Sequence, residues 1–454
     1  MAGPNTALQE LSRWAAALQP GDIPAAVMRH ARYVVLDTFG AAIAGSMHPL
    51  IRTLGALAPS MTGSPYRLIA EQRRVSMSDA LVINGCAAQV HDLDETNLLS
   101  QTHAAAAILP ALVTMAGTRR VAGVDFLTAF LVGYEVQSAI GRAMAPAHGA
   151  EGWHPSATLG CFGAAASLAK LLRLDPSRWA VAMNLAGTQA AGVKATFGSM
   201  AKPLHFGKAA LNGVLAAIWA EAGISGGADT FAHPAGFAKA SSSGFCSPLK
   251  IGADWVIEFN NFKTFPCCME CHPVIEAALK LRATVEGPII SMRVRQSTTA
   301  YALVGERGFN SGYEAKFSLR YCLAYALVFG ILPMTAFDEP IIVAPAVSAL
   351  ISAIEIMPDR ELRHLEAEIS VMTDRGETWR QKTDLTSGLG VPRMHESALE
   401  EKFVKLAEPV IGASKSLQIL ASFRDYGALD DVADVFELAT RSAPLASTRT
   451  EAVS

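Results

Sequence analysis

The spacing of apolar residues predicts helices over most of the first 225 residues. After Pro24, which suits the start of a helix, Val27, Ala31 and Val34 recur at intervals that place them on one helical face. Ser76 is a typical N-cap for a later helix. Small residues dominate these segments and let helices approach closely, which favours a dense helical body. The same spacing predicts helices at about 80–89, 125–144, 156–172, 175–191 and 207–222, and an alanine-rich helix directly after His103.

The pattern changes after about Gly226. Residues 234–252 are rich in Gly, Ser and Ala, which predicts a loop. Residues 289–296 alternate between apolar and polar side chains, and so do residues 368–378 around the turn Asp374-Arg375-Gly376. This alternation predicts two β-strands in a part of the chain that is otherwise helical.

Helices are predicted again on either side of the second strand segment. Two of them, at 314–332 and 347–354, lie between the strand segments, and residues 397–439 return to helical spacing. We therefore expect a mainly α protein with its active site between two domains. The large all-helical domain would comprise residues 1–264 and 396–454, and the smaller α+β domain residues 265–395.

Composition narrows the class of protein. Of 454 residues, 51% are apolar and 17% are charged, against a typical charged share of about 25%, so much surface is expected to be buried. The net charge of −3 offers no basic excess for nucleic acid. The seven cysteines, an odd number in a long chain, fit a reducing compartment better than a disulfide framework. Glycine-rich phosphate-binding motifs and a GxSxG elbow do not occur, which argues against nucleotide chemistry and serine hydrolysis.

Targeting signals are not expected in this sequence. The N-terminal stretch lacks a basic segment followed by an apolar core, so it does not resemble a secretory signal. The apolar run at 321–337 contains Pro333 and is typical of a buried helix rather than a membrane span. We expect a cytoplasmic protein without a membrane partner, and the mitochondrial matrix stays open as an alternative.

The first candidate for chemistry is the run His91-Asp92-Leu93-Asp94-Glu95-Thr96, followed by His103. It places titratable groups between apolar helices, where charge is costly to bury. The helix after His103 could help to hold an anion at its N-terminus. A solvated capping loop is the alternative interpretation.

Two further clusters precede apolar helices. His154 lies in Gly152-Trp153-His154-Pro155, where Pro155 breaks the chain and Ser156 can cap the next helix, so this histidine could equally be structural. Lys202, His205 and Lys208 lie close together before another helix. Ammonium groups and helix N-termini both favour anions, so a carboxylate-binding site is one interpretation and a surface charge run is the other.

The fourth cluster is rich in cysteine. Cys268 and Cys271 form a CxxC motif, with Cys267 and His272 beside it and Lys263 a few residues before it. Zinc and iron–sulfur sites use such spacing, but a closed site needs about four ligands and the chain has no second CxxC. Buried thiols that act as small apolar side chains are therefore the favoured interpretation, and a metal-dependent lyase is the alternative.

Taken together, these clusters resemble the MmgE/PrpD family, which includes 2-methylcitrate dehydratase, cis-aconitate decarboxylase and iminodisuccinate epimerase. The matching stretches span about residues 5–410 in order: ARYVVLDTFGAAIAG, DLDET with His103, GWHPSATLGCFGAAA, KPLHFGKAALNG, KTFPCC with CHP, and YEAKFS. The resemblance implies a helical domain and a smaller α+β domain, a homodimer, and chemistry without a metal or other cofactor.

Motif by motif, the resemblance also implies site residues. Departures from the family pattern leave the reaction type open: Gln89 and Cys268 stand where histidines occur in some members, Ala104 replaces a proline, and Glu95 replaces an aspartate. The implied catalytic residues are Asp92, Thr96, His103 and His154, and the implied substrate-binding residues are Lys202, Lys263, His272 and Tyr321.

A lyase that acts on a small di- or tricarboxylate is the function that this resemblance implies. Cations would hold the carboxylates and stabilise developing negative charge, and histidines would move protons near neutral pH. Dehydration of a 2-methylcitrate-type acid is favoured because the set of charged residues is intact and the extra histidine at Cys268 is absent. Decarboxylation of cis-aconitate, epimerisation of an iminodisuccinate and a non-catalytic dimeric binding protein are the alternatives.

Overall fold

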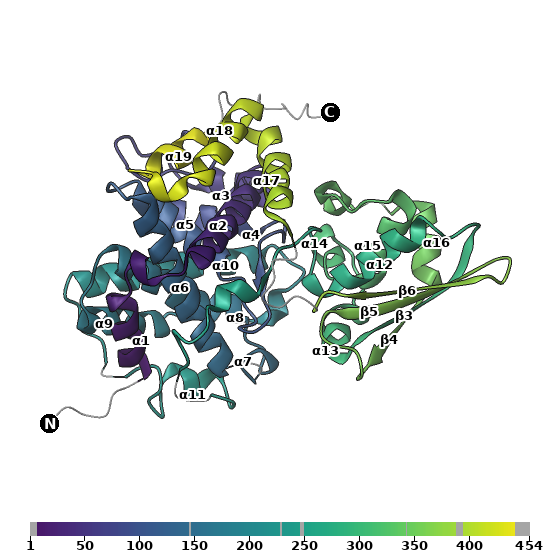
Figure 1. The fold of residues 1–454 in the computed structure, drawn as a ribbon, viewed down its shortest axis with the longest axis horizontal. Coiled ribbons are helices and arrows are strands. Elements are labelled where there is room, and N and C mark those ends of the chain that lie inside the picture. The colour runs from purple at the N-terminus through teal and green to yellow at the C-terminus, as the bar shows by residue number, and fades with distance from the viewer. Residues whose placement is uncertain are drawn as a thin grey trace, which may run out of the picture.

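The structure is a computed structural model that describes residues 7–144, 147–227, 229–245, 249–341, 343–386 and 394–440. Figure 1 shows a large helical body beside a smaller body that contains a sheet. The predicted fold class, mainly α with an additional α+β part, is confirmed. The helical body comprises α1 (Ala7–Ala17), α2 (Ala25–Gly45), α3 (Pro49–Leu57), α4 (Met77–Gln89), α5 (Ala105–Ala116), α6 (Gly123–Met144), α7 (Ala147–Ala150), α8 (Pro155–Leu171), α9 (Pro176–Gly187), α10 (Ala201–Glu221), α11 (Phe237–Ser241), α17 (Glu396–Ile411), α18 (Ala413–Arg424) and α19 (Ala433–Leu438).

Small residues set the distances between the central helices. At the contact of α4 with α10, a Cβ atom on Gly207 would lie 2.2 Å from the carbonyl oxygen of Val82, and one on Gly85 would lie 2.6 Å from Cα of Gly207. Only glycine permits this approach, because a side chain on either helix would push the backbones apart. The contact matters for function, since α4 leads into the acidic segment and α10 carries Lys202.

The start of α10 differs from the prediction. We expected the helix to begin at about residue 207, after the lysine and histidine cluster, but it begins at Ala201 and includes Lys202, Pro203 and His205. Proline is compatible with the first turn, because N–H groups there have no partner within the helix. Similarly, residues 237–241 of the predicted loop form α11.

The smaller body is a mixed sheet covered by helices. Its strands are ordered β4-β3-β5-β6, with β3 parallel to β4 and antiparallel to β5, and β5 antiparallel to β6. Buried residues of β3 and β5, including Val294 and Ile369, share a core with Val274 and Ile275 of the covering helix α12. The elements are α12 (His272–Arg282), β3 (Ile289–Ser297), α13 (Thr298–Ala300), α14 (Gly312–Ala315), α15 (Leu319–Phe329), α16 (Pro345–Ala353), β4 (Ile354–Asp359), β5 (Glu366–Thr373) and β6 (Thr378–Asp384).

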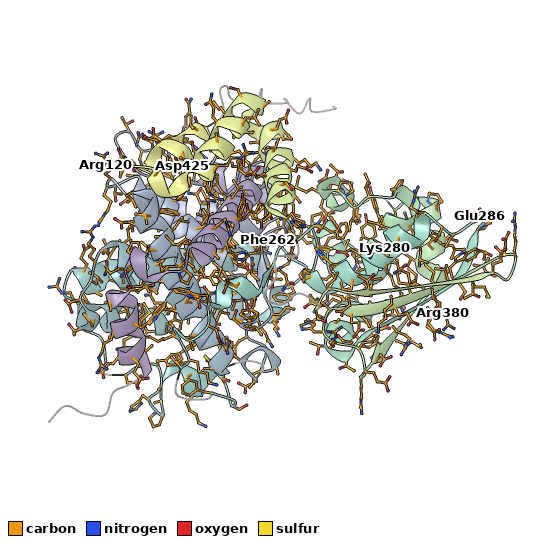
Figure 2. All side chains as sticks on the ribbon, viewed as in Figure 1. Arg120, Phe262, Lys280, Glu286, Arg380 and Asp425 are labelled. Atoms are coloured by element: carbon orange, nitrogen blue, oxygen red, sulfur yellow. The ribbon has the colours of Figure 1, made fainter. Side chains whose placement is uncertain are left out.

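The chain passes between the two bodies twice, after β2 and before α17. A two-stranded ribbon pairs β1 (Thr96–Asn97) with β2 (Asn260–Asn261), and Phe262, labelled in Figure 2 where the helical body meets the smaller one, follows directly. After the sheet the chain returns, and α17 packs on α2 through Phe403, which contacts Gly40. The exact domain boundaries given above stay a prediction. No single helix of the described residues is long and apolar enough to cross a membrane; only α2 and α3 taken together, with a 76° bend between them, reach that length.

Candidate active site

Asp92 lies at the centre of a buried charge cluster. Three residues after α4, its backbone adopts a left-handed conformation with φ of 56°, which turns the chain sharply into the body. Oδ1 of Asp92 accepts hydrogen bonds from Nζ of Lys263 at 2.7 Å and from Nζ of Lys202 at 3.1 Å. All three side chains are buried, so segments more than 100 residues apart in the sequence meet in one site.

The electrostatics of this cluster are governed by two opposing effects. Burial alone would raise the pKa of Asp92, but the ammonium groups of Lys202 and Lys263 outweigh it and hold this pKa well below its usual range. Burial would likewise lower the pKa of Lys263, and the charge of Asp92 raises it instead. Asp92 is therefore ionised and Lys263 protonated at neutral pH.

Lys316 adds a third buried ammonium group. It follows α14 in the smaller body and donates from Nζ to the carbonyl oxygen of Val90 at 2.8 Å. Burial, opposed by the charge of Asp92, lowers the pKa of Lys316 to about 8. The prediction missed this residue, although its motif YEAKFS had been noted. The available signal was a lysine placed between Ala315 and Phe317, in a segment that leads into an apolar helix.

Aromatic rings line one side of the lysines. Phe197 and Phe317 stack with centroids 5.5 Å apart, and Nζ of Lys202 lies 5.5 and 4.9 Å from their respective centroids. Cation–π attraction therefore stabilises the position of Lys202 without a second carboxylate partner.

The geometry fixes the tautomer of His103. Its Nδ1 lies 2.9 Å from the backbone carbonyl oxygen of Glu95 and 3.1 Å from Oδ2 of Asp94. A carbonyl oxygen only accepts, so Nδ1 must carry a hydrogen, which leaves Nε2 as the nitrogen that can exchange a proton. His103 is thus oriented as an acid or base.

Glu95 holds the loop that carries His103 against the helical body. Its Oε1 accepts the backbone N–H of Ala105 at 3.0 Å, at the start of α5, and its Oε2 accepts from the hydroxyl of Tyr134 at 2.9 Å. Burial raises the pKa of Glu95 to about 8. The side chain thus stays protonated at neutral pH and anchors the loop that presents His103.

His154 belongs to a pair of imidazoles. Its Nδ1 lies 2.8 Å from Nδ1 of His205, so one ring donates to the other and the pair shares a proton. Burial, with the nearby charges of His205 and Lys202, holds the pKa of His154 well below its usual range, and burial also lowers that of His205. His154 is therefore a neutral group at physiological pH. His205 was noted with Lys202 and Lys208, but its pairing with His154 was not predicted, because that pairing depends on the packing of α8 against α10.

The remaining predicted residues occupy different positions. Thr96 is buried in β1 opposite Asn261, on the segment that carries the acidic groups. Tyr321, expected to bind substrate, lies in the core of the smaller body, where its hydroxyl donates to the carbonyl oxygen of Ala336. His272, also expected to bind substrate, is buried beside Phe265 in the cysteine cluster. Among the described residues, the contacts of Tyr321 and His272 lie within the smaller body and do not include Asp92, Lys202 or Lys263, so their role in substrate binding stays a prediction.

Two wide cavities lie elsewhere on the helical body. One, of about 700 Å³, is lined by residues such as Trp153 and Phe237, and one of about 580 Å³ by residues such as Arg119 and Arg173. Neither lining includes Asp92 or the lysines. We therefore identify the site from its buried charged groups and oriented imidazoles. Such groups are costly to bury, and groups with perturbed pKa values cluster at functional sites.

Comparison with known proteins agrees with this architecture. The MmgE/PrpD N-terminal domain model matches residues 9–248, and the MmgE/PrpD C-terminal domain model matches residues 265–425. A cis-aconitate decarboxylase-like protein of Aspergillus oryzae is 29% identical and covers 94% of this chain and 95% of its own length. The human cis-aconitate decarboxylase is 28% identical, with 85% of this chain and 84% of that protein covered.

A third relative is similar over a shorter part. The cis-aconitate decarboxylase of Aspergillus terreus is 28% identical and covers 73% of each chain. These matches support a lyase of the dehydratase or decarboxylase type in general, and they do not fix its substrate. Because the two domain models together match most of its length, this chain belongs to the MmgE/PrpD family.

Proposed function

We propose that the protein is a carboxy-lyase that acts on cis-aconitate or a closely related tricarboxylate. The observation that carries the proposal is an excess of buried ammonium groups: those of Lys202, Lys263 and Lys316 outnumber the carboxylates of Asp92 and Asp94 that act on them. Buried charges require partners, and a multiply charged acid would supply them. The relatives named above, which cover most of this chain, support the same choice of substrate.

The proposed reaction begins with substrate binding at the lysines. The bond between carbon and the departing carboxylate breaks, CO₂ leaves, and the electron pair stays on carbon, where conjugation and nearby ammonium groups stabilise it. His103, protonated on both nitrogens, then donates the proton of Nε2 to this carbon. Its Nδ1–H remains hydrogen-bonded to the carbonyl oxygen of Glu95, so the ring keeps its orientation. Nε2 then regains a proton from solvent.

The imidazole pair has a separate task in this scheme. His154 and His205 are neutral, so they add polar contacts without adding to the positive charge. A neutral ring can donate one hydrogen bond to a substrate carboxylate while it accepts another from its partner. We assign His154 to substrate orientation rather than to proton transfer.

Dehydration of a 2-methylcitrate-type acid is the second candidate. Cys268 stands where some family members have a histidine. It interacts electrostatically with Asp92 and Lys263, so this chain has a thiol rather than an imidazole beside the lysine cluster. Its Sγ hydrogen-bonds to Oε2 of Glu270 at 2.8 Å. A site in which His103 transfers the proton suits dehydration as well as decarboxylation, since dehydration also needs one group to remove an α-proton as hydroxide leaves.

Separate incubations with cis-aconitate, 2-methylcitrate and iminodisuccinate, followed by NMR in deuterated buffer, test the proposal. We expect CO₂ and a deuterated unsaturated dicarboxylate from cis-aconitate. Loss of water from 2-methylcitrate alone would favour the second candidate, and solvent exchange without net change would favour an epimerase. Binding of all three acids without turnover would indicate a non-catalytic protein. Light scattering of the same preparation tests the homodimer that we also propose.

A further inference from the structure

A second cluster of reactive side chains lies in the core of the smaller body. The sulfur atoms of Cys267, Cys271 and Cys322 all lie within 4.8 Å of one another, and the three side chains are fully buried. Cys267 hydrogen-bonds with both of the other thiols. Cys271 ends the short helix before α12, and Cys322 lies on α15, so the cluster joins segments from different parts of the smaller body.

His272 lies beside Cys267 and could supply a fourth donor to this cluster. It is the first residue of α12, is 1% exposed, and its ring interacts with the thiol of Cys267. Its Nε2 is buried and has no hydrogen-bond partner among the described residues. Buried polar atoms are normally satisfied, so an orphaned imidazole nitrogen beside three thiols points to a bound ion.

This donor set matches one class of ligand. Three thiolates and an imidazole form a closed tetrahedral site for zinc, with Zn–S bonds of about 2.3 Å that place neighbouring sulfurs about 3.8 Å apart. The upper limit of 4.8 Å for the sulfur separations requires only small movements of the three thiols to reach this geometry, whereas the His272 ring, whose nitrogens lie outside this limit, must turn toward them. Hard cations such as Mg²⁺ prefer oxygen ligands and do not suit the site.

We propose that Cys267, Cys271, Cys322 and His272 bind one structural Zn²⁺ ion. Sequence spacing had suggested Cys268 as a ligand, but its thiol is hydrogen-bonded to Glu270. The third thiol of the cluster is instead that of Cys322, which is 51 residues from Cys271 in sequence. The proposal also differs from the expectation of a protein without metal. The ion would be structural, because four protein ligands leave no open position for substrate.

The position of this ion links it to the lysine cluster. The backbone N–H of Cys268 donates to the carbonyl oxygen of Lys316 at 3.0 Å, and Lys316 interacts electrostatically with Cys267. Zinc with three thiolates and a neutral imidazole carries one net negative charge, which the ammonium of Lys316 would offset. Metal binding would therefore fix the segment after Lys263 and the segment before α15 in one arrangement, independently of which acid the protein binds.

Metal analysis of the full chain tests the proposal. The protein is produced with zinc in the medium, purified under reducing conditions, and analysed by inductively coupled plasma mass spectrometry. We expect about one zinc per chain. Replacement of the zinc by Co²⁺ should give visible bands of a tetrahedral ion and a near-ultraviolet thiolate-to-metal band. Because this spectrum is measured on the unaltered protein, it remains informative if a cysteine variant fails to fold.

Variants then identify the ligands. Cys322→Ser and His272→Gln should each weaken zinc binding by at least about 100-fold in competition with a chelating dye, since each removes a direct ligand. Cys161→Ser is the matched control, because this thiol is buried outside the cluster and donates to the carbonyl oxygen of Ala157. It should keep the metal. A wild-type protein without stoichiometric zinc and without the cobalt bands would overturn the proposal, as would zinc affinity that Cys322→Ser leaves unchanged.

Discussion

Replacing Asp92 by asparagine tests the charge balance of the site, because it removes the negative charge with little change in side-chain shape. Coulomb's law with an effective dielectric constant of about 20 gives attractions of about 6 kcal/mol to Lys263 and about 5 kcal/mol to Lys202, at 2.7 and 3.1 Å. These are not net energies, since desolvation of each ion costs several kcal/mol. Removing one member of a buried ion pair typically costs about 3–5 kcal/mol, because the partner charge stays buried and unpaired. We expect Asp92→Asn to lose stability by this amount.

The same variant should respond more strongly to an anionic ligand. Tricarballylate, a tricarboxylate that lacks both the hydroxyl and the double bond, would supply the missing negative charge. A ligand at 100 times its dissociation constant stabilises a protein by about 2.7 kcal/mol, and each tenfold gain in affinity at fixed concentration adds about 1.4 kcal/mol. We expect tricarballylate to restore more stability to Asp92→Asn than it adds to the wild type.

Urea denaturation, followed by circular dichroism at constant ionic strength with and without tricarballylate, measures both effects. Asp37→Asn is the matched control: Asp37 is also buried, and its Oδ1 pairs with Nζ of Lys402 at 2.6 Å. That variant should lose stability with much less extra rescue by the ligand, because the charge of Asp37 acts mainly on Lys402 and only weakly on Lys263. If Asp92→Asn is as stable as the wild type, or is rescued no more than Asp37→Asn, the reasoning is refuted.

Three further predictions concern the histidine, the third lysine and the buried glutamate. His103→Ala should lower kcat by about 10²–10⁴-fold while the folded variant still binds tricarballylate, and near-full turnover would exclude His103 as the acid. Lys316 loses its proton as the pH rises through about 8, so kcat/KM for a tricarboxylate should fall above that pH, and Lys316→Met should abolish this dependence in a pH–rate profile. Glu95, whose pKa rises from 4.5 to about 8 on folding, keeps a proton that the unfolded chain loses. Stability should therefore fall as pH rises from 4.5 to 8, and unfolding curves of Glu95→Gln should lack this slope.

The sequence predicted the helices well, because helical spacing is repeated over many turns. It missed β4, where only Ile354 and Ile356 alternate before Pro358, a pattern too short to distinguish from the end of a helix. It also misplaced the start of α10, since Pro203 signals a break but is compatible with a first turn.

The candidate site could be predicted only in part. Charged residues in apolar surroundings led to Asp92 and Lys202, because charges are costly to bury, whereas Lys263 was implied by the family resemblance. The pairing of His154 with His205 depends on how two helices pack, and no sequence spacing encodes it. Tyr321 was assigned by family resemblance, and the structure places it in the core of the smaller body.

Cysteine spacing was misleading for a related reason. The CxxC motif directed attention to Cys268, whereas the fold brings Cys322 of α15 to Cys267 and Cys271. Contacts between distant elements are therefore the part of a site that periodicity and motifs do not reveal.

A crystal structure of the protein with bound tricarballylate tests the central claim most directly. We predict that its carboxylates lie within hydrogen-bonding distance of Nζ of Lys202, Lys263 and Lys316, and that Nε2 of His103 faces the ligand carbon chain. A fully occupied ligand that binds elsewhere, for example in the cavity beside Trp153, and leaves these lysines without contact would contradict the account.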